Sequence, residues 1–318
     1  MKNYIWVKVF KDENKERIKM EVGLIGLGKM GYNLALNLRD HKHEIIAYNR
    51  SSDKTESIEK EGIRGVYSIK ELCHSFKDKR IIWMMIPSGD AVDNTIDELL
   101  EFLSPGDVVI DGGNSFYKDS IRRYHKLKTL GIDFVDVGTS GGTDGARNGA
   151  CTMVGGEPEV IDYLSPLFKD ISVENGYSYI GAPGSGHYVK MVHNAIEYGM
   201  MQAIGEGFEL LNASPFDIDF HNVAKVWSNG SIIEGLLMRS VLGAFEKSDR
   251  LENIQGIVDS SGEGQWAVEE ALRLKVSMPV ISNALFARYK SVDTGKFSEK
   301  VVASIRKEFG GHAIHEKR

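Results

Sequence analysis

The sequence is poor in cysteine, lacks long apolar runs and carries no excess of positive charge. Its two cysteines, Cys73 and Cys151, exclude a disulfide framework and fit a cytoplasmic protein, and we interpret both as core residues. No apolar run approaches the roughly 20 residues of a membrane span, and the start of the chain has no signal-peptide core, so we expect no membrane association. A formal net charge of −6 gives no reason to expect a nucleic-acid partner.

The patterning predicts an extension followed by two domains. We interpret residues 1–19 as an N-terminal extension, either an extra strand or a loose tail. Strand and helix patterns alternate over residues 20–182, which predicts an α/β Rossmann-type domain with a mainly parallel sheet. Helical periodicity over residues 183–318 predicts an all-α C-terminal domain. The predicted strands are 22–25, 44–48, 80–87, 107–111, 134–137 and 150–154, and the predicted C-terminal helices are 186–213, 220–242, 263–275, 283–290 and 298–309.

The strongest motif of the first domain is a glycine-rich turn, G-L-G-K-M-G, at residues 26–31. It lies between a predicted strand and a predicted helix. Two glycines let the backbone turn toward a pyrophosphate, and the third lets the helix pack on the strand. The phosphates would meet free N–H groups at the helix N-terminus. We therefore predict a dinucleotide held by Gly26, Leu27, Gly28, Met30 and Gly31.

The residues after the second strand indicate which dinucleotide binds. An NAD site usually has an acidic residue there, about 20 residues after the turn, to hold the ribose 2′-hydroxyl. This chain has Asn49, Arg50 and Ser51 instead. A guanidinium beside hydroxyl groups suits a 2′-phosphate, so we predict NADP, with NAD as the alternative. Arg50 could otherwise be an exposed arginine that begins a loop.

Two polar residues beside glycines follow later strands. Asn114 comes after strand 107–111, and Ser140 precedes Gly141 and Gly142 after strand 134–137. In open sheets of this kind ligands bind outside the carboxyl ends of the strands, so we expect a substrate role for both. Taken alone, each would be a helix cap or a turn residue.

The first C-terminal helix carries a cluster of ionisable and polar groups. Lys190, His193, Asn194 and Glu197 stand at positions i, i+3, i+4 and i+7 and therefore share one helical face. Together they offer a base, an acid and hydrogen-bond donors, which are the groups that proton-transfer chemistry needs. The alternative is a solvated polar stripe without a catalytic role.

These motifs together resemble a known family. G-L-G-x-M-G, D-G-G-N-S, G-T-S-G-G and K-M-V-H-N-x-I-E-Y are similar to motifs of the β-hydroxyacid dehydrogenase superfamily. Within it, H-N-x-I-E-Y-G-M-M-Q resembles the 6-phosphogluconate dehydrogenase family. The resemblance covers residues 20–314. It is to the short bacterial form, which lacks the second helical repeat of the long enzymes.

The resemblance implies a reaction of the pentose phosphate pathway. 6-Phosphogluconate would be oxidised and decarboxylated to ribulose 5-phosphate and CO2, with reduction of NADP and without a metal ion. Lys190 would take the proton of the 3-hydroxyl group and then polarise the 3-keto group, and Glu197 would protonate the enediol carbon. The first step requires a neutral amine, although only about 1 in 2,500 lysines is neutral at pH 7. A partly closed crevice would have to favour the neutral form by desolvation.

The resemblance also implies contacts with the substrate. The residues implied for the sugar acid are Asn114, Ser140, Gly141, Gly142, His193, Asn194 and Tyr198; Asn114 would contact the cofactor as well. Arg288 and Arg306 would hold the phosphate, and His312 lies in the matching tail. In the long enzymes this tail comes from a neighbouring subunit, so a homodimer or higher homo-oligomer with shared sites is expected. Without the resemblance, Arg288 would be interpreted as part of a surface salt bridge and His312 as part of a frayed terminus.

One segment departs from the long forms, and two other functions remain open. The long forms have K-G-T-G-K-W where residues 261–266 read S-G-E-G-Q-W, so a phosphate-binding lysine is lost and Glu263 is gained. One alternative is a sister dehydrogenase of an unphosphorylated acid such as 3-hydroxyisobutyrate. The other is a non-catalytic NADP-binding sensor. His193, Asn194, Glu197 and Tyr198, with Arg306 and His312, argue against the first, because Glu197 has little to do without a decarboxylated carbon to protonate. The presence of both Lys190 and Glu197 argues against the sensor.

Overall fold

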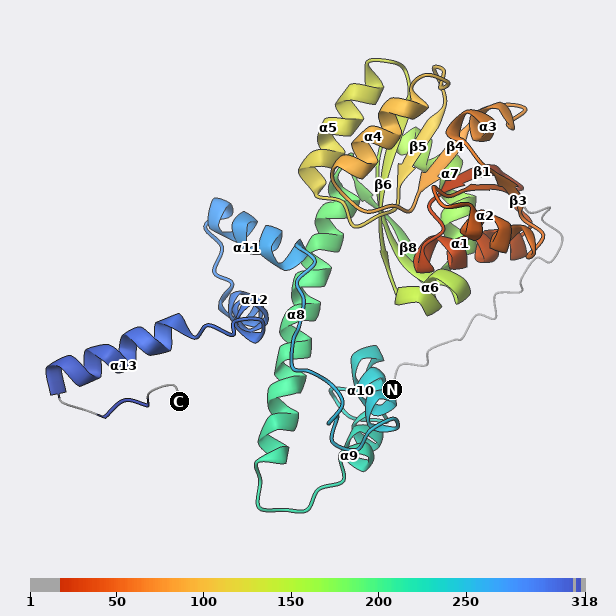
Figure 1. Ribbon diagram of the computed structural model, residues 1–318. Coiled ribbons are helices and arrows are strands. Elements are labelled where there is room, and N and C mark those ends of the chain that lie inside the picture. The colour runs from red at the N-terminus through yellow and green to blue at the C-terminus, as the bar shows by residue number, and fades with distance from the viewer. Residues whose placement is uncertain (1–17, 311–312, 316–318) are drawn as a thin grey trace, which may run out of the picture. The chain divides into compact units, whose positions relative to one another are not determined.

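The computed structural model describes residues 18–310 and 313–315, and the chain divides into two compact units, Met1–Lys190 and Met191–Arg318 (Figure 1). Residues 1–17 of the expected extension lie outside the described residues, and so does His312. The domain boundary expected after residue 182 falls between the end of the last strand at Gly181 and the start of a long helix at Ser185.

The N-terminal unit is an α/β domain with one eight-stranded, mainly parallel sheet, which confirms the predicted fold class. The strand order is β3-β2-β1-β4-β5-β6-β7-β8, and β7 runs antiparallel to β6. The strands are β1 Glu21–Ile25, β2 Glu44–Tyr48, β3 Arg64–Val66, β4 Ile81–Met84, β5 Val108–Asp111, β6 Asp133–Ser140, β7 Ala150–Gly155 and β8 Ser172–Gly181. The helices are α1 Lys29–Asp40, α2 Ser52–Glu59, α3 Ile69–His74, α4 Asp90–Leu99, α5 Tyr117–Lys128, α6 Gly142–Asn148 and α7 Pro158–Ile171.

Two strands were absent from the sequence-based prediction, and the strand at residues 150–154 is not the last one. β3 has only three residues, too few for a periodic signal. β8 has ten residues, but none of them is buried, so its apolar residues do not alternate with polar ones. Both strands are recognised only through their pairing, β3 with β2 and β8 with β7.

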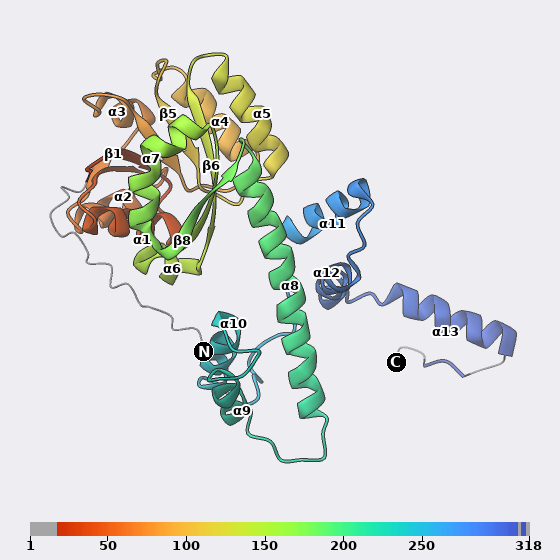
Figure 2. The same cartoon turned by 180° about the vertical axis from the view of Figure 1, so that it is seen from behind.

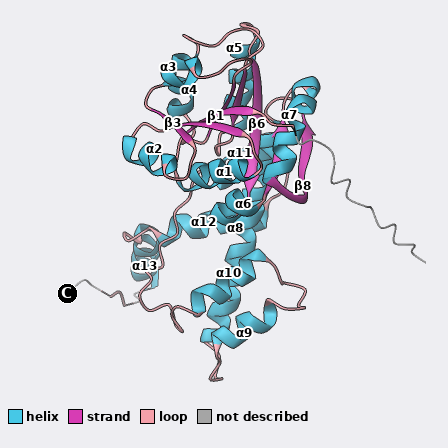
Figure 3. Cartoon of the chain, turned by 90° about the vertical axis from the view of Figure 1, so that its right-hand side faces the viewer, coloured by secondary structure: helices cyan, strands magenta, loops and turns pink. Residues whose placement is uncertain are grey.

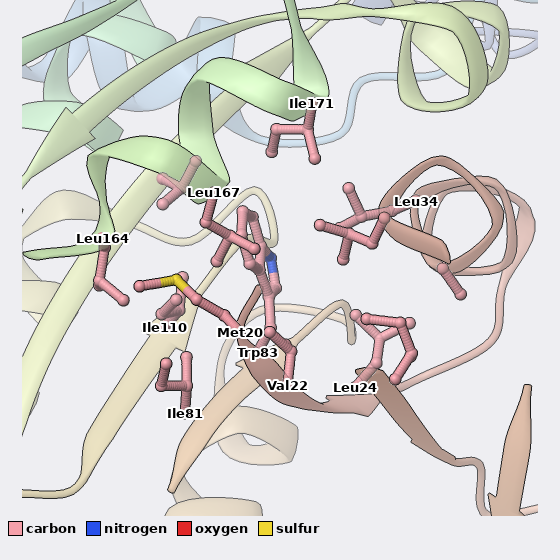
Figure 4. Close-up of a cluster of buried hydrophobic side chains, with 14 of the residues drawn as sticks. Met20, Val22, Leu24, Leu34, Ile81, Trp83, Ile110, Leu164, Leu167 and Ile171 are labelled. Atoms are coloured by element: carbon pink, nitrogen blue, oxygen red, sulfur yellow. The ribbon is translucent and has the colours of Figure 1, made fainter. Parts of the chain in front are cut away.

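The apolar core of this unit lies on both faces of the sheet. In β4, Ile81 and Trp83 belong to the cluster that packs against α1 and α7, whereas Ile82 and Met84 belong to the cluster against α3 and α4. Figure 4 shows Trp83 between α1 and α7, surrounded by Leu34, Leu167 and other aliphatic side chains. A strand that is buried on both faces has a continuous apolar sequence, which is why these strands were predictable.

The C-terminal unit is helical, as expected. The long helix α8, Ser185–Asn212, is drawn in Figure 2; its residues up to Lys190 belong to the N-terminal unit and those from Met191 on to the C-terminal unit. It is followed by α9 Phe220–Trp227, α10 Leu236–Phe245, α11 Glu263–Leu274, α12 Pro279–Ser291 and α13 Phe297–Gly310. The single helix predicted over residues 220–242 is wrong. α9 ends at Trp227 and α10 begins at Leu236, and between them Gly230 and Gly235 have φ angles of 80° and 155°. Figure 3 shows strands only in the N-terminal unit.

The two cysteines differ from each other. Cys73 is buried in α3, and burial raises the pKa of its thiol to about 11. Cys151 is exposed on β7, so its interpretation as a core residue is wrong. The side chains of a strand alternate between faces, and the face of β7 that carries Cys151 is not covered at this position. No helix within the described ranges is both long and apolar enough to cross a membrane.

Candidate active site

The glycine-rich turn between β1 and α1 has the geometry that a dinucleotide requires. Gly26 has a φ of 98°, and a Cβ there would lie 2.5 Å from the carbonyl oxygen of Met85. A Cβ at Gly31 would overlap the carbonyl oxygen of Gly26, so the third glycine allows the helix to approach the turn. A Cβ at Gly28 would meet nothing within 4 Å, which leaves open space directly at the N-terminus of α1. The turn therefore fits a pyrophosphate group.

Asn49 connects this turn to the end of β2. Its Oδ1 accepts a hydrogen bond of 2.9 Å from the backbone N–H of Leu27, and its Nδ2 donates to Ser51 Oγ at 2.9 Å. Asn49 therefore shapes the turn, a role that sequence analysis did not foresee. Arg50 is exposed, and its guanidinium makes no hydrogen bond or ion pair with the described part of the chain. A cationic group thus stands beside the expected ribose position.

The loop after β5 is fixed by a buried carboxylate. Asp111 accepts hydrogen bonds from Ser115 Oγ at 2.7 Å and from the backbone N–H of Gly113 at 3.2 Å. Arg123, only 1% exposed, lies 3.3 Å from the same carboxylate. Asn114 stands between these anchored residues with its side chain exposed. The loop therefore presents Asn114 at the carboxyl end of β5, where ligands bind in such sheets.

A second buried carboxylate holds the start of α8. Asp136 of β6 accepts hydrogen bonds from the backbone N–H groups of Gly184 at 2.6 Å and His187 at 2.8 Å. These are unpaired donors of a helix N-terminus, which favours a negative charge. Asp136 pairs with Asp111 in the sheet, so both carboxylates stand at the same level, where β5 ends.

Lys190 packs directly on β6 at Gly138, which lies two residues beyond Asp136. A Cβ at Gly138 would overlap the Cβ of Lys190, and Lys190 is only 7% exposed. Because residues i, i+2 and i+4 of a strand point to one face, Asp136, Gly138 and Ser140 all face α8. The N-terminal unit therefore places Lys190 on the same side of β6 as Ser140. Gly141 and Gly142 follow with φ angles of 116° and 63° and begin α6.

The polar face of α8 is partly buried. Asn194 is 9% exposed, and the side chains of His193 and Glu197 are 37% and 38% exposed. His193 Nδ1 lies 3.1 Å from Asn194 Oδ1 and 4.0 Å from Glu197 Oε2. Ile196, outside this polar face, is 50% exposed. Lys190 and Asn194 are thus buried although Ile196 is not, and buried polar groups of this kind are typical of a functional site.

In the C-terminal unit, Tyr198 brings together residues from three helices and a loop. The guanidinium of Arg288 lies 3.5 Å from the centre of the Tyr198 ring. A Cβ at Gly264 would lie 2.6 Å from Cε2 of the same ring. Ser261 Oγ and the Tyr198 hydroxyl are 3.3 Å apart, and Ser261 Oγ donates to Glu263 Oε2 at 2.6 Å. Two residues implied for substrate binding, Tyr198 and Arg288, are therefore in contact.

The last implied phosphate residues are not joined to this cluster. Arg306 is exposed on α13 and makes no hydrogen bond or ion pair with any described residue. His312 lies outside the described residues. α13 also exposes apolar side chains on its surface: Phe297, Val301, Val302 and Ile305 are 40–75% exposed.

Sequence analysis missed the residues that support the site. Asp111 and Asp136 had a signal: each is an acidic residue beside buried apolar residues in a strand that is followed by glycine. His187 and Ser120, whose side chains lie 2.7 Å apart between α8 and α5, had none.

These features define a dinucleotide-binding protein of the doubly wound α/β class with a lysine at the ligand-binding side of its sheet. The comparison with protein families is more specific. Residues 21–186 match the NAD binding domain of 6-phosphogluconate dehydrogenase, and residues 186–310 match the C-terminal domain of 6-phosphogluconate dehydrogenase. The chain belongs to the 6-phosphogluconate dehydrogenase family of NAD(P)-dependent oxidoreductases.

Individual relatives include short and long forms. A Bacillus subtilis (strain 168) protein, provisionally named 6-phosphogluconate dehydrogenase YqeC, is 49% identical over 298 residues, which cover 94% of this chain and 100% of that protein. The NAD(+)-dependent, decarboxylating 6-phosphogluconate dehydrogenase of Haloferax volcanii is 39% identical over 94% of this chain and 99% of its own length. The Plasmodium falciparum 6-phosphogluconate dehydrogenase, solved with NADP+ and with 6-phosphogluconate, has a TM-score of 0.79 and 32% identity. The match covers 93% of this chain and 66% of that longer one.

Proposed function

We propose that the protein oxidises and decarboxylates 6-phosphogluconate to ribulose 5-phosphate and CO2. The observation that carries the proposal is the position of Lys190, which is buried against Gly138 at the carboxyl end of β6. Burial disfavours the charged form of an amine, as a base in this reaction requires. The names of the Haloferax volcanii and Plasmodium falciparum relatives support the same substrate and reaction.

In this proposal each group on α8 has a role in proton transfer. Lys190 takes the proton of the 3-hydroxyl group and, once protonated, polarises the 3-keto group so that CO2 departs. Glu197, two helical turns further on, gives a proton to the enediol carbon. His193 and Asn194 hold the substrate between these steps. The bound nicotinamide supplies the hydride acceptor for C3.

We propose NADP as the preferred cofactor. Gly26, Leu27, Gly28, Met30 and Gly31 would surround its pyrophosphate. The exposed guanidinium of Arg50 and the nearby Ser51 would hold the 2′-phosphate, which an acidic residue would repel. The Haloferax volcanii relative uses NAD+, so the comparison with that short form supports the alternative.

Asn114, Ser140, Gly141, Gly142 and Tyr198 would contact the sugar acid, and Arg288 would hold its phosphate. We also propose a homo-oligomer in which Arg306 and His312 complete a neighbouring site. The exposed apolar residues of α13 support this arrangement, because such a surface is usually covered by a partner.

Turnover with defined substrates tests the proposal. The protein is incubated with 6-phosphogluconate and either NADP or NAD, and absorbance at the nicotinamide band and CO2 release are followed. We expect equal amounts of reduced cofactor and CO2. Equal rates with gluconate would contradict the phosphorylated substrate, and cofactor binding without CO2 from any sugar acid would indicate a sensor.

A further inference from the structure

The hydrogen bonds around Tyr198 have a defined direction. An ionised carboxylate only accepts hydrogen bonds, so the 2.6 Å contact between Ser261 Oγ and Glu263 Oε2 consumes the single hydroxyl proton of Ser261. This length is typical of a charge-assisted O–H···O bond and is much shorter than the 3.3 Å between Ser261 Oγ and Tyr198. The Ser261 proton therefore points to Glu263 and not to the surface.

The Tyr198 hydroxyl proton also has a defined direction. Its oxygen accepts from the backbone N–H of Ser261 at 3.3 Å, so its proton is available for Ser261 Oγ. The Tyr198 ring cannot easily turn away, because it is only 5% exposed and lies against Arg288 and Gly264. Tyr198 thus donates to Ser261, and Ser261 donates to Glu263. Each hydroxyl oxygen that remains accessible is an acceptor.

We infer that Glu263 is a specificity-determining residue: by orienting the Ser261 and Tyr198 hydroxyls inward, it leaves Arg288 as the side-chain donor that this cluster offers to an anion. This inference rests on the proposed function, because it concerns the part of the site proposed to bind the substrate's phosphate. Phosphate oxygens need donors, whereas the hydroxyl groups of a sugar can donate to Ser261 Oγ. The cluster therefore binds phosphate more weakly than its residue types suggest.

Glu263→Gln tests the direction of these bonds. An amide donates as well as accepts, so the introduced amide would donate to Ser261 Oγ and release the Ser261 proton toward a ligand. We expect this variant to bind inorganic phosphate and 6-phosphogluconate on the order of tenfold more tightly, as a hydrogen bond to a charged group is worth that much.

Charge and hydrogen-bond direction can be separated in a second background. Removing a negative charge would itself favour an anion, with or without Ser261. In the Ser261→Ala background the hydroxyl is absent. Glu263→Gln should therefore increase the affinity for phosphate much less in this background than in the protein that keeps Ser261. An undiminished gain in the Ser261→Ala background would overturn the inference, and so would unchanged or weaker phosphate binding by Glu263→Gln.

The matched control is Glu269→Gln, which makes the same chemical change on the exposed side of α11. Phosphate affinity equal to that of the unmodified protein is expected, whereas an equal gain in this control would reject the inference. Binding of inorganic phosphate is measured by calorimetry on the full chain, so the result does not depend on turnover. If no 6-phosphogluconate is converted but the phosphate result holds, the proposed function fails, whereas the effect of Glu263 on anion binding is supported. Thermal unfolding of each variant verifies that α11 remains folded.

Discussion

Lys190 packs against Gly138: the Cβ of Lys190 fills the space that a side chain at position 138 would occupy. A Cβ at Gly138 would also lie 2.9 Å from the carbonyl oxygen of Gly186, in the first turn of α8. The position of the proposed base thus depends on the absence of a side chain on the neighbouring strand.

Gly138→Ala should therefore reduce catalysis without unfolding the N-terminal unit. The added methyl group must push Lys190 and the start of α8 away from β6, and a displacement of about 1 Å at a reacting group costs up to 100-fold in rate. We expect kcat to fall by roughly that factor, with cofactor affinity changed less than about threefold, measured by steady-state kinetics and fluorescence titration. Gly243→Ala is the control, since a Cβ there meets nothing within 4 Å. A fully active Gly138→Ala would contradict this account.

Lys190→Met removes the amine but keeps the length of the side chain. Because general base catalysis contributes about 10²–10⁴-fold, we expect turnover of 6-phosphogluconate to fall at least 100-fold. The dissociation constants of NADP and NAD should be unchanged, because the glycine-rich turn is not altered. Retention of a tenth of the original rate would exclude Lys190 as the base.

Arg50→Asp should shift the cofactor preference toward NAD. The substitution places a carboxylate where it repels the 2′-phosphate of NADP and can accept a hydrogen bond from the 2′-hydroxyl of NAD. We expect the ratio of kcat/KM for NADP to that for NAD to fall at least about tenfold, which corresponds to about 1.4 kcal/mol. An unchanged ratio would show that Arg50 does not contact the ribose.

Asn49→Ala provides a contrast at the adjacent residue. It removes the hydrogen bond to the Leu27 N–H, and so loosens the turn that both dinucleotides share. Both cofactors should therefore bind more weakly by a similar factor, measured by the same titrations. A selective loss of NADP binding would instead mean that Asn49 contacts the 2′-phosphate.

Asp93→Asn should alter how stability depends on pH. Hydrogen bonds from Arg123 first, and then from Arg122, hold the pKa of Asp93 well below its usual range. A carboxylate with a lowered pKa stabilises the fold above the pKa of the unfolded state, about 3.9, and loses this contribution as the pH falls below it. We expect the variant to be less stable by about 2 kcal/mol near pH 7, and the difference from the unmodified protein to narrow below about pH 4.

The measurement is urea unfolding of the full chain, followed by tryptophan fluorescence, at several pH values. Asp90→Asn, at an exposed position in the same turn of α4, serves as the control. A stability difference that stayed constant down to about pH 3 would contradict the assigned ion pair.

The sequence predicted those parts of the fold that repeat a simple pattern. β2 was predicted with its observed bounds, because Ile45, Ile46 and Ala47 form a continuous buried run between a helix end and a turn. β8 was missed because none of its residues is buried. The break between α9 and α10 was missed because apolar residues resume at Ile232 and Ile233, soon after Gly230. The local pattern of apolar and polar residues does not show which strand another strand pairs with, or which backbone angles a residue adopts.

For the site, the sequence identified side chains with chemical groups better than it identified their supports. The polar face of α8 was visible from helical spacing alone. The contact between Arg288 and Tyr198 joins residues 90 positions apart and has no local signal. The role of Asp136 in holding Gly184 and His187 likewise depends on how β6 meets α8.

The reversed direction of β7 determines where the chain leaves the sheet. β7 begins beside Ser140 and returns to the level of Asp136, and β8 follows it in the same direction, ending beside Gly155. The chain therefore reaches the carboxyl edge of the parallel strands just before α8 begins. Because β7 runs back along β6, β8 also ends at the level of Asp136, whose carboxylate holds the first backbone N–H groups of α8.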